Sequence, residues 1–353
     1  MCVWVQFVVA LGFALVLTPF MRRLAMRTDV LDVPTGRKVH GVPTPLLGGV
    51  AIYVSILLTL ALTAGGSAVF REDPLPFVFG LLTILMLVGL FDDCVGLSWQ
   101  LRLGIQLGAA WLMWRNGVRV QLEWLPQWVN VVVSLVWLAG VANAINFLDN
   151  MNGLAAGLCA IAAGSFALLG CINGQPELAG VAAAVAGSCL GFLRFNYRAA
   201  SIFMGDAGSL LLGMLLAFLG LRLHISSGTN VITWMSPILI MGVPVFDMTL
   251  VCVSRLMKRR NPFATPGRDH VSHRLVQAGL TRLQAVDMVY LAALVCSCFG
   301  VVVSLLPPWA AYTAGGVFAV AFVTGLVVLL VRLPVVYTAN GGGSAREASE
   351  GEL

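Results

Sequence analysis

Charged residues are scarce in this sequence of 353 residues, and their scarcity excludes an ordinary soluble domain. Only 10% of the residues are charged and 59% are hydrophobic, whereas roughly a quarter of the residues in typical soluble domains are charged. Apolar runs close to the length that spans a bilayer recur from Trp4 to Leu330. The composition therefore predicts an all-α, polytopic membrane protein without a separate soluble domain.

The sequence also lacks paired cysteines, internal repeats and the marks of a removable leader. Its eight cysteines are scattered without a CxxC pair, so we interpret them as small apolar residues. The first apolar run, residues 2–20, has no basic region before it and no small-residue cleavage site after it, so we expect it to remain as a helix. The net charge of +5 is spread over short loops beside helices, which argues against a nucleic-acid partner.

Apolar runs separated by polar breaks predict eleven membrane-spanning helices. Pro237 and Pro244 fall inside the ninth run, and we expect them to bend it because each removes a backbone donor. The expected helices cover residues 2–20, 46–64, 76–91, 101–114, 128–146, 154–172, 177–193, 207–224, 231–254, 286–306 and 309–331. We expect one transmembrane domain over residues 1–335 and a disordered cytoplasmic tail over residues 336–353.

Basic residues predict the orientation, because Lys and Arg are enriched in cytoplasmic loops. With the N-terminus outside, 17 of the 21 basic residues fall inside, leaving only Arg71, Arg115, Arg119 and Arg222 outside. The C-terminus is then cytoplasmic, and the expected cytoplasmic loops are 21–45, 92–100, 147–153, 194–206 and 255–285. The same alternation brings to this side the polar residues Asp92, Asp93, Asn143, Asn146, Asp149, Asp206, Asp247, His270 and His273.

Two of these loops carry cations that suit phosphate binding. In the first, Arg37, Lys38 and His40 precede the glycine pair Gly48-Gly49, and Arg can fork onto phosphate oxygens while glycine permits close backbone approach. The longest loop is the most cationic segment of the chain and contains Arg255, Lys258, Arg259, Arg260, Arg268, His270, His273 and Arg274. The alternatives are a positive-inside loop in the first case and attraction to anionic lipid heads in the second.

A carboxylate pair, Asp92-Asp93, directly follows the third apolar run, where charge is costly unless water or a cation compensates it. This position predicts a functional site. Adjacent residues of a helix point about 100° apart, so we expect only one of the two carboxylates to face a given ligand. The alternative is a helix end at the membrane surface, where water solvates both side chains.

At the end of the fifth run, Asn143, Asn146 and Asp149 recur at every third residue and share a helical face, and Asn152 follows. Amide and carboxylate oxygens suit a Mg²⁺ site that substrate phosphates complete. Interhelical hydrogen bonding is the alternative reading of this pattern.

The segment Gly205-Asp206-Ala207-Gly208-Ser209 opens the eighth expected helix. Backbone donors and the helix dipole could receive phosphate there, while Asp206 holds a cation. An ordinary Asp N-cap would look similar in sequence.

Taken in order, these blocks resemble the motifs of the polyprenyl-phosphate N-acetylhexosamine-1-phosphate transferases, the superfamily of the peptidoglycan translocase and the WecA/TagO-type initiating enzymes. The resemblance covers about residues 20–285. It rests on five blocks: Arg37-Lys38-Val39-His40, Asp92-Asp93, the Asn143/Asn146/Asp149 helix, Gly205-Asp206-Ala207-Gly208-Ser209, and His270-Val271-Ser272-His273-Arg274-Leu275. Arg255 and the pair Pro244 and Asp247 match further family positions.

The resemblance implies a magnesium enzyme, with Mn²⁺ as an alternative metal, that transfers a hexosamine 1-phosphate from a UDP-N-acetylhexosamine to polyprenyl phosphate and releases UMP. It implies catalytic roles for Asp92, Asp93, Asp149 and Asp206, and metal ligation by Asp206, Asp149 and Asn152. The implied substrate-binding residues are Arg37, Lys38, His40, Asn143, Asn146, Arg255, Arg268, His270 and His273. For an initiating enzyme, UDP-N-acetylglucosamine and undecaprenyl phosphate are the expected substrates. The implied location is the bacterial inner membrane, with the site on its cytoplasmic face. A homodimer is one assembly that the resemblance allows.

The sequence departs from the family pattern at Asn150 and Asn152, where relatives often carry Gly and Asp, and at Ser272, where initiating relatives often carry His. Asn152 can coordinate a metal but cannot act as a base. We therefore expect the catalytic carboxylates to be those of Asp92, Asp93, Asp149 and Asp206. We expect direct in-line displacement, with a covalent aspartyl intermediate as the alternative. The competing function is a multi-helix transporter or lipid flippase, whose sites should lie near the bilayer midplane.

Overall fold

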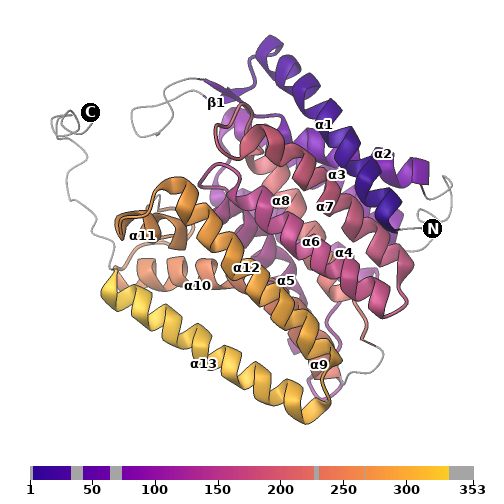
Figure 1. Ribbon diagram of the computed structural model, residues 1–353, viewed down its shortest axis with the longest axis vertical. Coiled ribbons are helices and arrows are strands. Elements are labelled where there is room, and N and C mark those ends of the chain that lie inside the picture. Colours follow the sequence, from indigo (N-terminus) through magenta and orange to yellow (C-terminus); the bar gives the residue numbers. More distant parts are fainter. Residues whose placement is uncertain (1–2, 33–42, 64–73, 226–229, 266, 334–353) are drawn as a thin grey trace.

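The computed structural model describes residues 3–32, 43–63, 74–225, 230–265 and 267–333, and its regular structure is almost entirely helical (Figure 1). The helices are α1 (Val3–Arg27), α2 (Gly48–Thr63), α3 (Leu75–Val95), α4 (Trp99–Arg115), α5 (Gln127–Leu148), α6 (Leu154–Ile172), α7 (Pro176–Asn196), α8 (Gly205–Arg222), α9 (Asn230–Ile240), α10 (Gly242–Met257), α11 (Val271–Gln277), α12 (Arg282–Leu305) and α13 (Pro308–Arg332). Two short antiparallel strands, β1 (Leu31–Asp32) and β2 (Thr44–Pro45), precede α2.

Eight helices of the described part are long and apolar enough to cross a membrane, or nine if α9 and α10 form one broken span. The protein is therefore a multi-pass membrane protein. Each of the eleven expected helices has a counterpart, but α2 has 16 residues and α4 has 17, so both are shorter than the other spans. The count of eleven spans and the orientation stay predictions.

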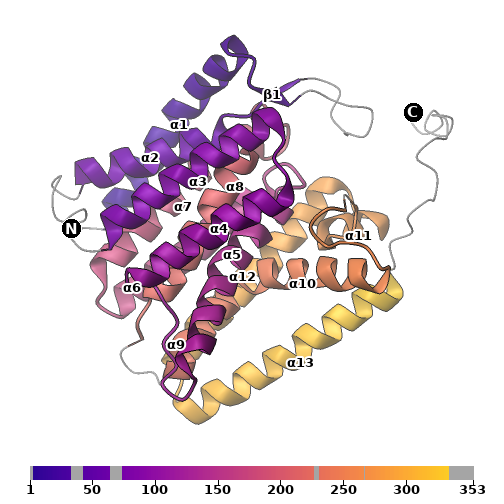
Figure 2. The same cartoon turned by 180° about the vertical axis from the view of Figure 1, so that it is seen from behind.

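Helix α8 forms the core of the bundle and lies between the other helices in both views (Figures 1 and 2). Every residue from Ala207 to Gly220 is buried. Small residues allow this packing: a Cβ at Gly89 of α3 would lie 2.6 Å from the Cα of Ala207, and a Cβ at Gly213 would lie 2.6 Å from the Cα of Ala142 in α5. Close approach of small residues is how helices associate where lipid removes the hydrophobic drive.

The expected bend in the ninth helix is confirmed. Helices α9 and α10 meet at Met241, between Pro237 and Pro244, with an angle of 72° between their axes. This break points α10 toward the end of the bundle that carries α11, while α12 and α13 run past it (Figure 1).

Several expected loops are shorter in the structure because helices continue through them. Helix α1 extends to Arg27, within the expected loop 21–45, and α11 lies inside the expected loop 255–285. The turn between α3 and α4 comprises only residues 96–98, because Gly96 ends α3 in the left-handed conformation and Ser98 caps α4. The expected tail 336–353 lies outside the described residues.

Candidate active site

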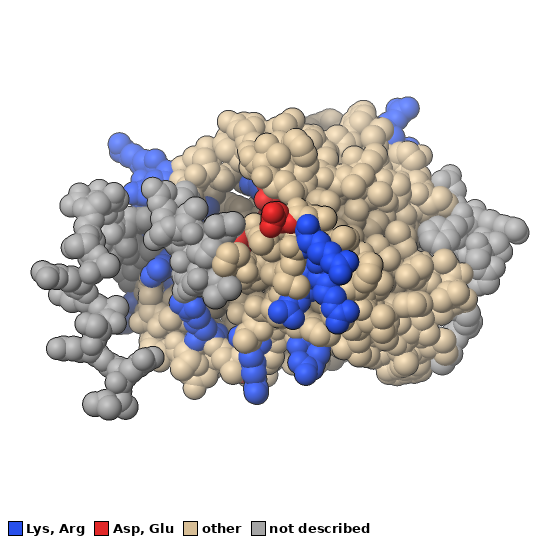
Figure 3. Space-filling view, turned by 90° about the horizontal axis from the view of Figure 1, so that it is seen from above, with Lys and Arg blue, Asp and Glu red and all other residues tan. Residues whose placement is uncertain are grey.

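Polar side chains from four helices meet at one end of the bundle. The carboxyl ends of α3 and α5 and the amino ends of α4 and α8 come together there, because consecutive helices alternate in direction. Viewed onto this end, acidic side chains lie at a hollow, with Lys and Arg side chains around it (Figure 3). Three of the sequence blocks, at Asp92-Asp93, Asn146-Asp149 and Asp206, are therefore brought to one place.

Arg102, at the start of α4, links two of the predicted catalytic carboxylates. Its Nη1 donates to Asp92 Oδ2 at 2.7 Å and to Asp206 Oδ2 at 2.5 Å. Asp92 is buried, and its other oxygen accepts the backbone N–H of Leu97 at 2.5 Å. The sequence interpretation counted Arg102 only toward the charge balance of the loops, so it missed the cation at the centre of the site.

Asp93 points to the start of α8. Its carboxylate accepts the backbone N–H of Asp206 at 2.9 Å and that of Ala207 at 3.3 Å. From the sequence, we expected the free backbone N–H groups at this helix end to bind phosphate. Two of them bind Asp93 instead, because a carboxylate suits the positive end of a helix. The reading of Asp206 as an N-cap is also wrong, since Met204 holds that position.

The positive φ of Gly205 makes this contact possible. The residue has a φ of 71°, and an added Cβ would lie 2.4 Å from Asp93 Oδ2. A larger side chain would therefore be strained and would displace Asp93. The glycine thus fixes Asp93 against α8 and holds the neighbouring Asp206 in place.

The amides of α5 join the site through hydrogen bonds. Asn146 Nδ2 donates to Asp206 Oδ1 at 2.7 Å and to Ser209 Oγ at 2.9 Å, and Asn143 donates to Gln106 of α4. Interhelical hydrogen bonding and site formation are therefore not alternatives here. Asn146 does both, because its partner is a predicted metal ligand.

Asp149 follows α5 and titrates near neutral pH. Burial, and then the charge of Asp206, raise the pKa of the Asp149 carboxyl to about 7. Asn152 is exposed, and its amide donates to the carbonyl of Arg198 at 3.4 Å. Asn150 accepts the hydroxyl of Ser272 at 2.8 Å, so the loop after α5 contacts the histidine segment.

Gly153 ends this loop and is bonded on both sides. Its N–H donates to Asn196 Oδ1 at 2.8 Å, and its carbonyl accepts the Tyr290 hydroxyl at 2.6 Å. Asn196 is buried and donates to the carbonyl of Ile202 at 2.8 Å, just before the turn that carries Asp206. These bonds tie the Asp149 loop to the Asp206 turn.

Arg255 is bound by other groups of its own loop, which the sequence did not predict. It is buried, with Nε 3.2 Å from Asp269 Oδ2 and Nη1 2.5 Å from the carbonyl of Pro262. Asp269 is fully buried and also accepts the hydroxyl of Ser254 at 2.9 Å. A buried carboxylate needs such partners, so Arg255 holds the loop. The expectation was that Arg255 binds substrate, whereas the structure pairs it with Asp269.

The rings of His270 and His273 lie side by side, edge to face, with 6.0 Å between their centroids. His270 is buried, and its Nδ1 lies 2.8 Å from Asp247 Oδ2. Burial, followed by the nearby charges of His270 and Arg268, lowers the pKa of His273 to about 4. Arg268 is exposed. The predicted residues Arg37, Lys38 and His40 lie outside the described residues.

Comparison with known proteins places the chain in a family. The model of glycosyl transferase family 4 matches residues 75–224, from α3 to α8. A probable undecaprenyl-phosphate N-acetylglucosaminyl 1-phosphate transferase of Bacillus subtilis is 31% identical over 86% of each chain. The chain belongs to the polyprenyl-phosphate hexosamine-1-phosphate transferase superfamily. Similar too are a decaprenyl-phosphate N-acetylglucosaminephosphotransferase of Mycolicibacterium smegmatis, at 31% identity over 90% of this chain and 86% of that protein, and an undecaprenyl-phosphate alpha-N-acetylglucosaminyl 1-phosphate transferase of Escherichia coli K12, at 28% over 82% of each.

The donor set of this transferase fits Mg²⁺. In the described part of the chain, no three His, Cys, Asp or Glu side chains stand close enough to enclose a metal ion. Mg²⁺ does not need such a cage, because it is usually bound through one or two carboxylates, waters and substrate phosphates. Asp92 and Asp206 already share a positive charge, the Arg102 guanidinium. Two carboxylates carry more negative charge than this single guanidinium balances, so a second cation is compatible with the arrangement.

Proposed function

We propose that this protein transfers N-acetylglucosamine 1-phosphate from UDP-N-acetylglucosamine to undecaprenyl phosphate and releases UMP. The product would initiate synthesis of an envelope polysaccharide, with the site on the cytoplasmic face of the bacterial inner membrane. One observation carries the proposal: Arg102 binds carboxylates of α3 and α8, and an amide of α5 binds one of them, at one end of an apolar bundle. The relatives support the sugar, because their names specify N-acetylglucosamine.

The reaction is a substitution at phosphorus. An oxygen of the lipid phosphate forms a bond to the phosphorus that carries the sugar, and the bond from that phosphorus to the bridging oxygen breaks. The bridging oxygen leaves with the electron pair as part of UMP. Both reactants are anionic, because the second pKa of a phosphate monoester lies near 6. Charge repulsion is therefore the main barrier that the site has to lower.

The side chains of this site would lower that barrier by positioning charge. Arg102 is fixed by two carboxylates, and its side chain is 27% exposed, so it can present a donor to phosphate without losing both partners. Exposed Arg268 adds charge beside the histidines. His270 is oriented by Asp247, and we assign its Nε2 to a phosphate oxygen. Preorganised donors of this kind are the usual source of rate enhancement in phosphoryl transfer.

Mg²⁺ is the cofactor we assign, with Asp206 and Asp149 as the residues that would hold it and Asn152 as a further oxygen donor. When bound, the ion supplies positive charge beside the diphosphate. Asp149 suits this role because its pKa of about 7 allows it to lose its proton as a cation arrives.

Direct displacement by the lipid phosphate is the mechanism we favour over a covalent aspartyl intermediate. An acceptor that is already ionised needs little help from a base, and Asp93, one of the four carboxylates, is engaged by the start of α8. With UDP-sugar alone, no phosphorylated protein should accumulate. A stable aspartyl phosphate under those conditions would overturn direct displacement.

The transporter or flippase reading predicts polar sites near the bilayer midplane, whereas the polar contacts described here lie at helix ends. The deciding experiment is UMP release by the purified protein in detergent with undecaprenyl phosphate, Mg²⁺ and a panel of UDP-sugars. Asp206→Asn should abolish release, while Glu123→Gln, an exposed carboxylate in the α4–α5 connection, should leave it unchanged. EDTA should stop the reaction. Folded protein that releases no UMP with any donor would reject the transferase.

A further inference from the structure

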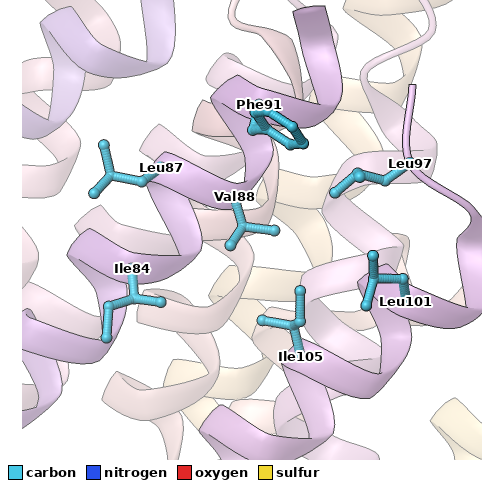
Figure 4. Close-up of a pocket in the computed structure, with 7 residues that line it drawn as sticks. All are labelled: Ile84, Leu87, Val88, Phe91, Leu97, Leu101 and Ile105. Carbon is cyan, nitrogen blue, oxygen red and sulfur yellow. The ribbon is translucent and has the colours of Figure 1, made fainter. Parts of the chain in front are cut away.

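The two sides of the candidate site are held in place in different ways. Asp92 and Arg102 lie on the long helices α3 and α4, whose apolar side chains face each other across a groove (Figure 4). His273 instead lies on α11, a helix of only seven residues, and His270 directly precedes it. A helix this short is not stable by itself. The positions of the two histidines therefore depend on contacts with other elements.

Arg274, in the middle of α11, supplies several of these contacts. It is 1% exposed, and its Nε donates to the carbonyl of Asp269, the residue before His270, at 2.9 Å. Its Nη2 donates to the hydroxyl of Ser254 on α10 at 3.1 Å. Ser254 in turn donates to the buried carboxylate of Asp269 at 2.9 Å. The guanidinium thus ties the chain immediately before His270 to α10.

The same guanidinium reaches the last turn of α13. Its Nη1 donates to the carbonyl of Leu329 at 2.7 Å and to the carbonyl of Leu333 at 2.5 Å. The end of a helix carries the negative pole of its dipole, so a cation is favourable there. A buried charge needs such partners. Arg274 therefore joins three elements, because it lies on α11 and binds both α10 and the end of α13.

Helix α13 lies along the outside of the bundle in both ribbon views (Figures 1 and 2). Ala311 is the one buried residue of this helix, all of which the structure describes. Near its middle, Phe318 stacks on Phe299 of α12 and Phe322 meets Phe246 of α10 edge to face, with ring centroids 5.9 Å and 4.9 Å apart. These rings hold the middle of α13, while Arg274 binds its end beside α11.

Two contacts show what a fixed α11 keeps in place. The ring of His270 meets Phe147 of α5 edge to face, with 6.0 Å between centroids. Ser272 of α11 donates to Asn150 at 2.8 Å. Phe147 and Asn150 belong to the end of α5 and the loop that carries Asp149. A displacement of α11 would therefore move His270 relative to the predicted metal ligands.

We propose that Arg274 is a positioning residue for the reaction, which braces the histidine segment against the last turn of α13. The inference rests on the proposed function, which assigns His270 to a phosphate oxygen. Arg274 is buried and meets no substrate; it acts through His270 by fixing the backbone on either side of that histidine. The outer helix α13 thereby contributes to the site through its carbonyl groups.

The test compares Arg274→Gln and Arg274→Lys with Phe322→Leu in the full-length protein. Lys keeps the positive charge but lacks the planar fork, so it can reach only some of the partners of the guanidinium, whereas Gln keeps neither. Phe322→Leu loosens the middle of the same helix away from the histidine segment, so it controls for a loss of stability alone. The kcat of UMP release and the unfolding midpoint are measured for each variant.

We expect Arg274→Gln to lower kcat about 10- to 100-fold, the usual loss when a partner that orients a functional residue is removed. Arg274→Lys should lose less, and it keeps the test decisive if Arg274→Gln does not fold. Phe322→Leu should keep the wild-type kcat although its unfolding midpoint falls. In a His270→Gln background, Arg274→Gln should add little further loss, because the histidine that it positions is already gone.

Two results would overturn the brace and leave the proposed function standing. One is a wild-type kcat in both Arg274 variants, or losses that add in full to that of His270→Gln. The other is a loss of kcat in Phe322→Leu as large as that in Arg274→Lys, which would mean that any loosening of α13 has the same effect.

Amide hydrogen exchange tests the brace separately from UMP release, so that its failure and the failure of the proposed function can be told apart. In both Arg274 variants, the amides of residues 269–277 should exchange about tenfold faster than in the wild type, the change expected when one hydrogen bond no longer opposes local opening. The amides of α2 should exchange as before. Equal exchange of residues 269–277 in the wild type and both variants would show that Arg274 does not brace this segment.

Discussion

Asp247 and His270 form a buried pair, in which the carboxylate fixes the histidine ring. Asp247 Oδ2 lies 2.8 Å from Nδ1, while its Oδ1 accepts the backbone N–H of Val271 at 2.7 Å. Asp247 is fully buried, and His270 is 6% exposed. A carboxylate beside Nδ1 favours a proton on that nitrogen, so Nε2 faces away from Asp247. Asp247 is therefore a positioning residue for His270.

The first prediction concerns this pair. In Asp247→Asn, the amide oxygen keeps the bond from Val271 and the amide nitrogen then faces Nδ1, where a donor opposes the Nδ1 proton, so the ring loses the partner that orients it. Loss of a partner that orients a functional histidine typically costs about 10- to 100-fold in activity, and we expect a kcat loss of that size. His270→Gln should cost as much, and the double variant no more than either. Exposed His224→Gln serves as the control; additive losses in the double variant would show that the two residues act separately.

The second prediction concerns Tyr290, whose hydroxyl donates to the carbonyl of Gly153 at 2.6 Å and fixes the loop after Asp149. Tyr290→Phe removes this bond without changing the packing against Gly157. Tyr53→Phe is the matched control, because its hydroxyl donates to the carbonyl of Phe79 at 2.8 Å in a contact between α2 and α3. Each substitution should lower stability by about 1 kcal/mol.

Only Tyr290→Phe should lower kcat and raise the Mg²⁺ concentration needed for half-maximal activity. The reason is that only the Tyr290 bond holds a loop with predicted metal ligands. Mg²⁺ titrations of UMP release, together with thermal unfolding of both variants, separate the two effects. Equal kinetics in the two variants would reduce Tyr290 to a purely structural role.

Sequence patterns predicted the helical segments and the convergence of Asp92, Asp149 and Asp206, because apolar run lengths and alternation across the membrane decide which helix ends meet. They could not assign partners between distant segments. Arg102 looked like any basic residue beside a helix, and its contact with Asp206 joins positions 104 residues apart. A spacing signal was present, because Arg102 and Gln106 share a face of α4 and both contact the site.

Arg255 and Asp93 illustrate the same limit. A cationic loop suggests phosphate binding when only the sequence is known. In the structure, Arg255 of this loop pairs with the buried carboxylate of Asp269. Adjacent aspartates likewise look equivalent, although Asp92 contacts Arg102 and Asp93 contacts the start of α8. The expected divergence of their side chains around the helix is confirmed, but which one meets which partner depends on tertiary packing.

The third prediction uses the pKa of His273, which burial and the neighbouring charges of His270 and Arg268 lower to about 4. Because the folded pKa lies below the unfolded value near 6.5, the unfolded chain binds more protons between pH 4 and 6.5. Stability from this group is therefore full above pH 6.5 and is lost as the pH falls toward 4.

His273→Gln removes this titration, so its unfolding midpoint should fall less between pH 7 and 4.5 than that of the wild type. Between these two pH values, the free energy of unfolding should fall by about 1 kcal/mol less in His273→Gln than in the wild type, after discounting for the partial exposure of His273. Thermal unfolding in detergent across this pH range measures it. Parallel curves for the two proteins would mean that His273 is not the group responsible.

The last prediction separates the two roles of Arg102, which pairs with Asp92 and Asp206 at once. Arg102→Gln leaves the buried Asp92 without its cation, and an unpaired buried charge is costly, so stability should fall by roughly 1–3 kcal/mol. Asp92→Asn in the same chain removes that charge and should restore most of the stability. Activity should stay low in the double variant, because the guanidinium that meets phosphate is still missing. Recovery of UMP release together with stability would instead make Arg102 a purely structural counterion, and the phosphate contact would have to come from Arg268 or another cation.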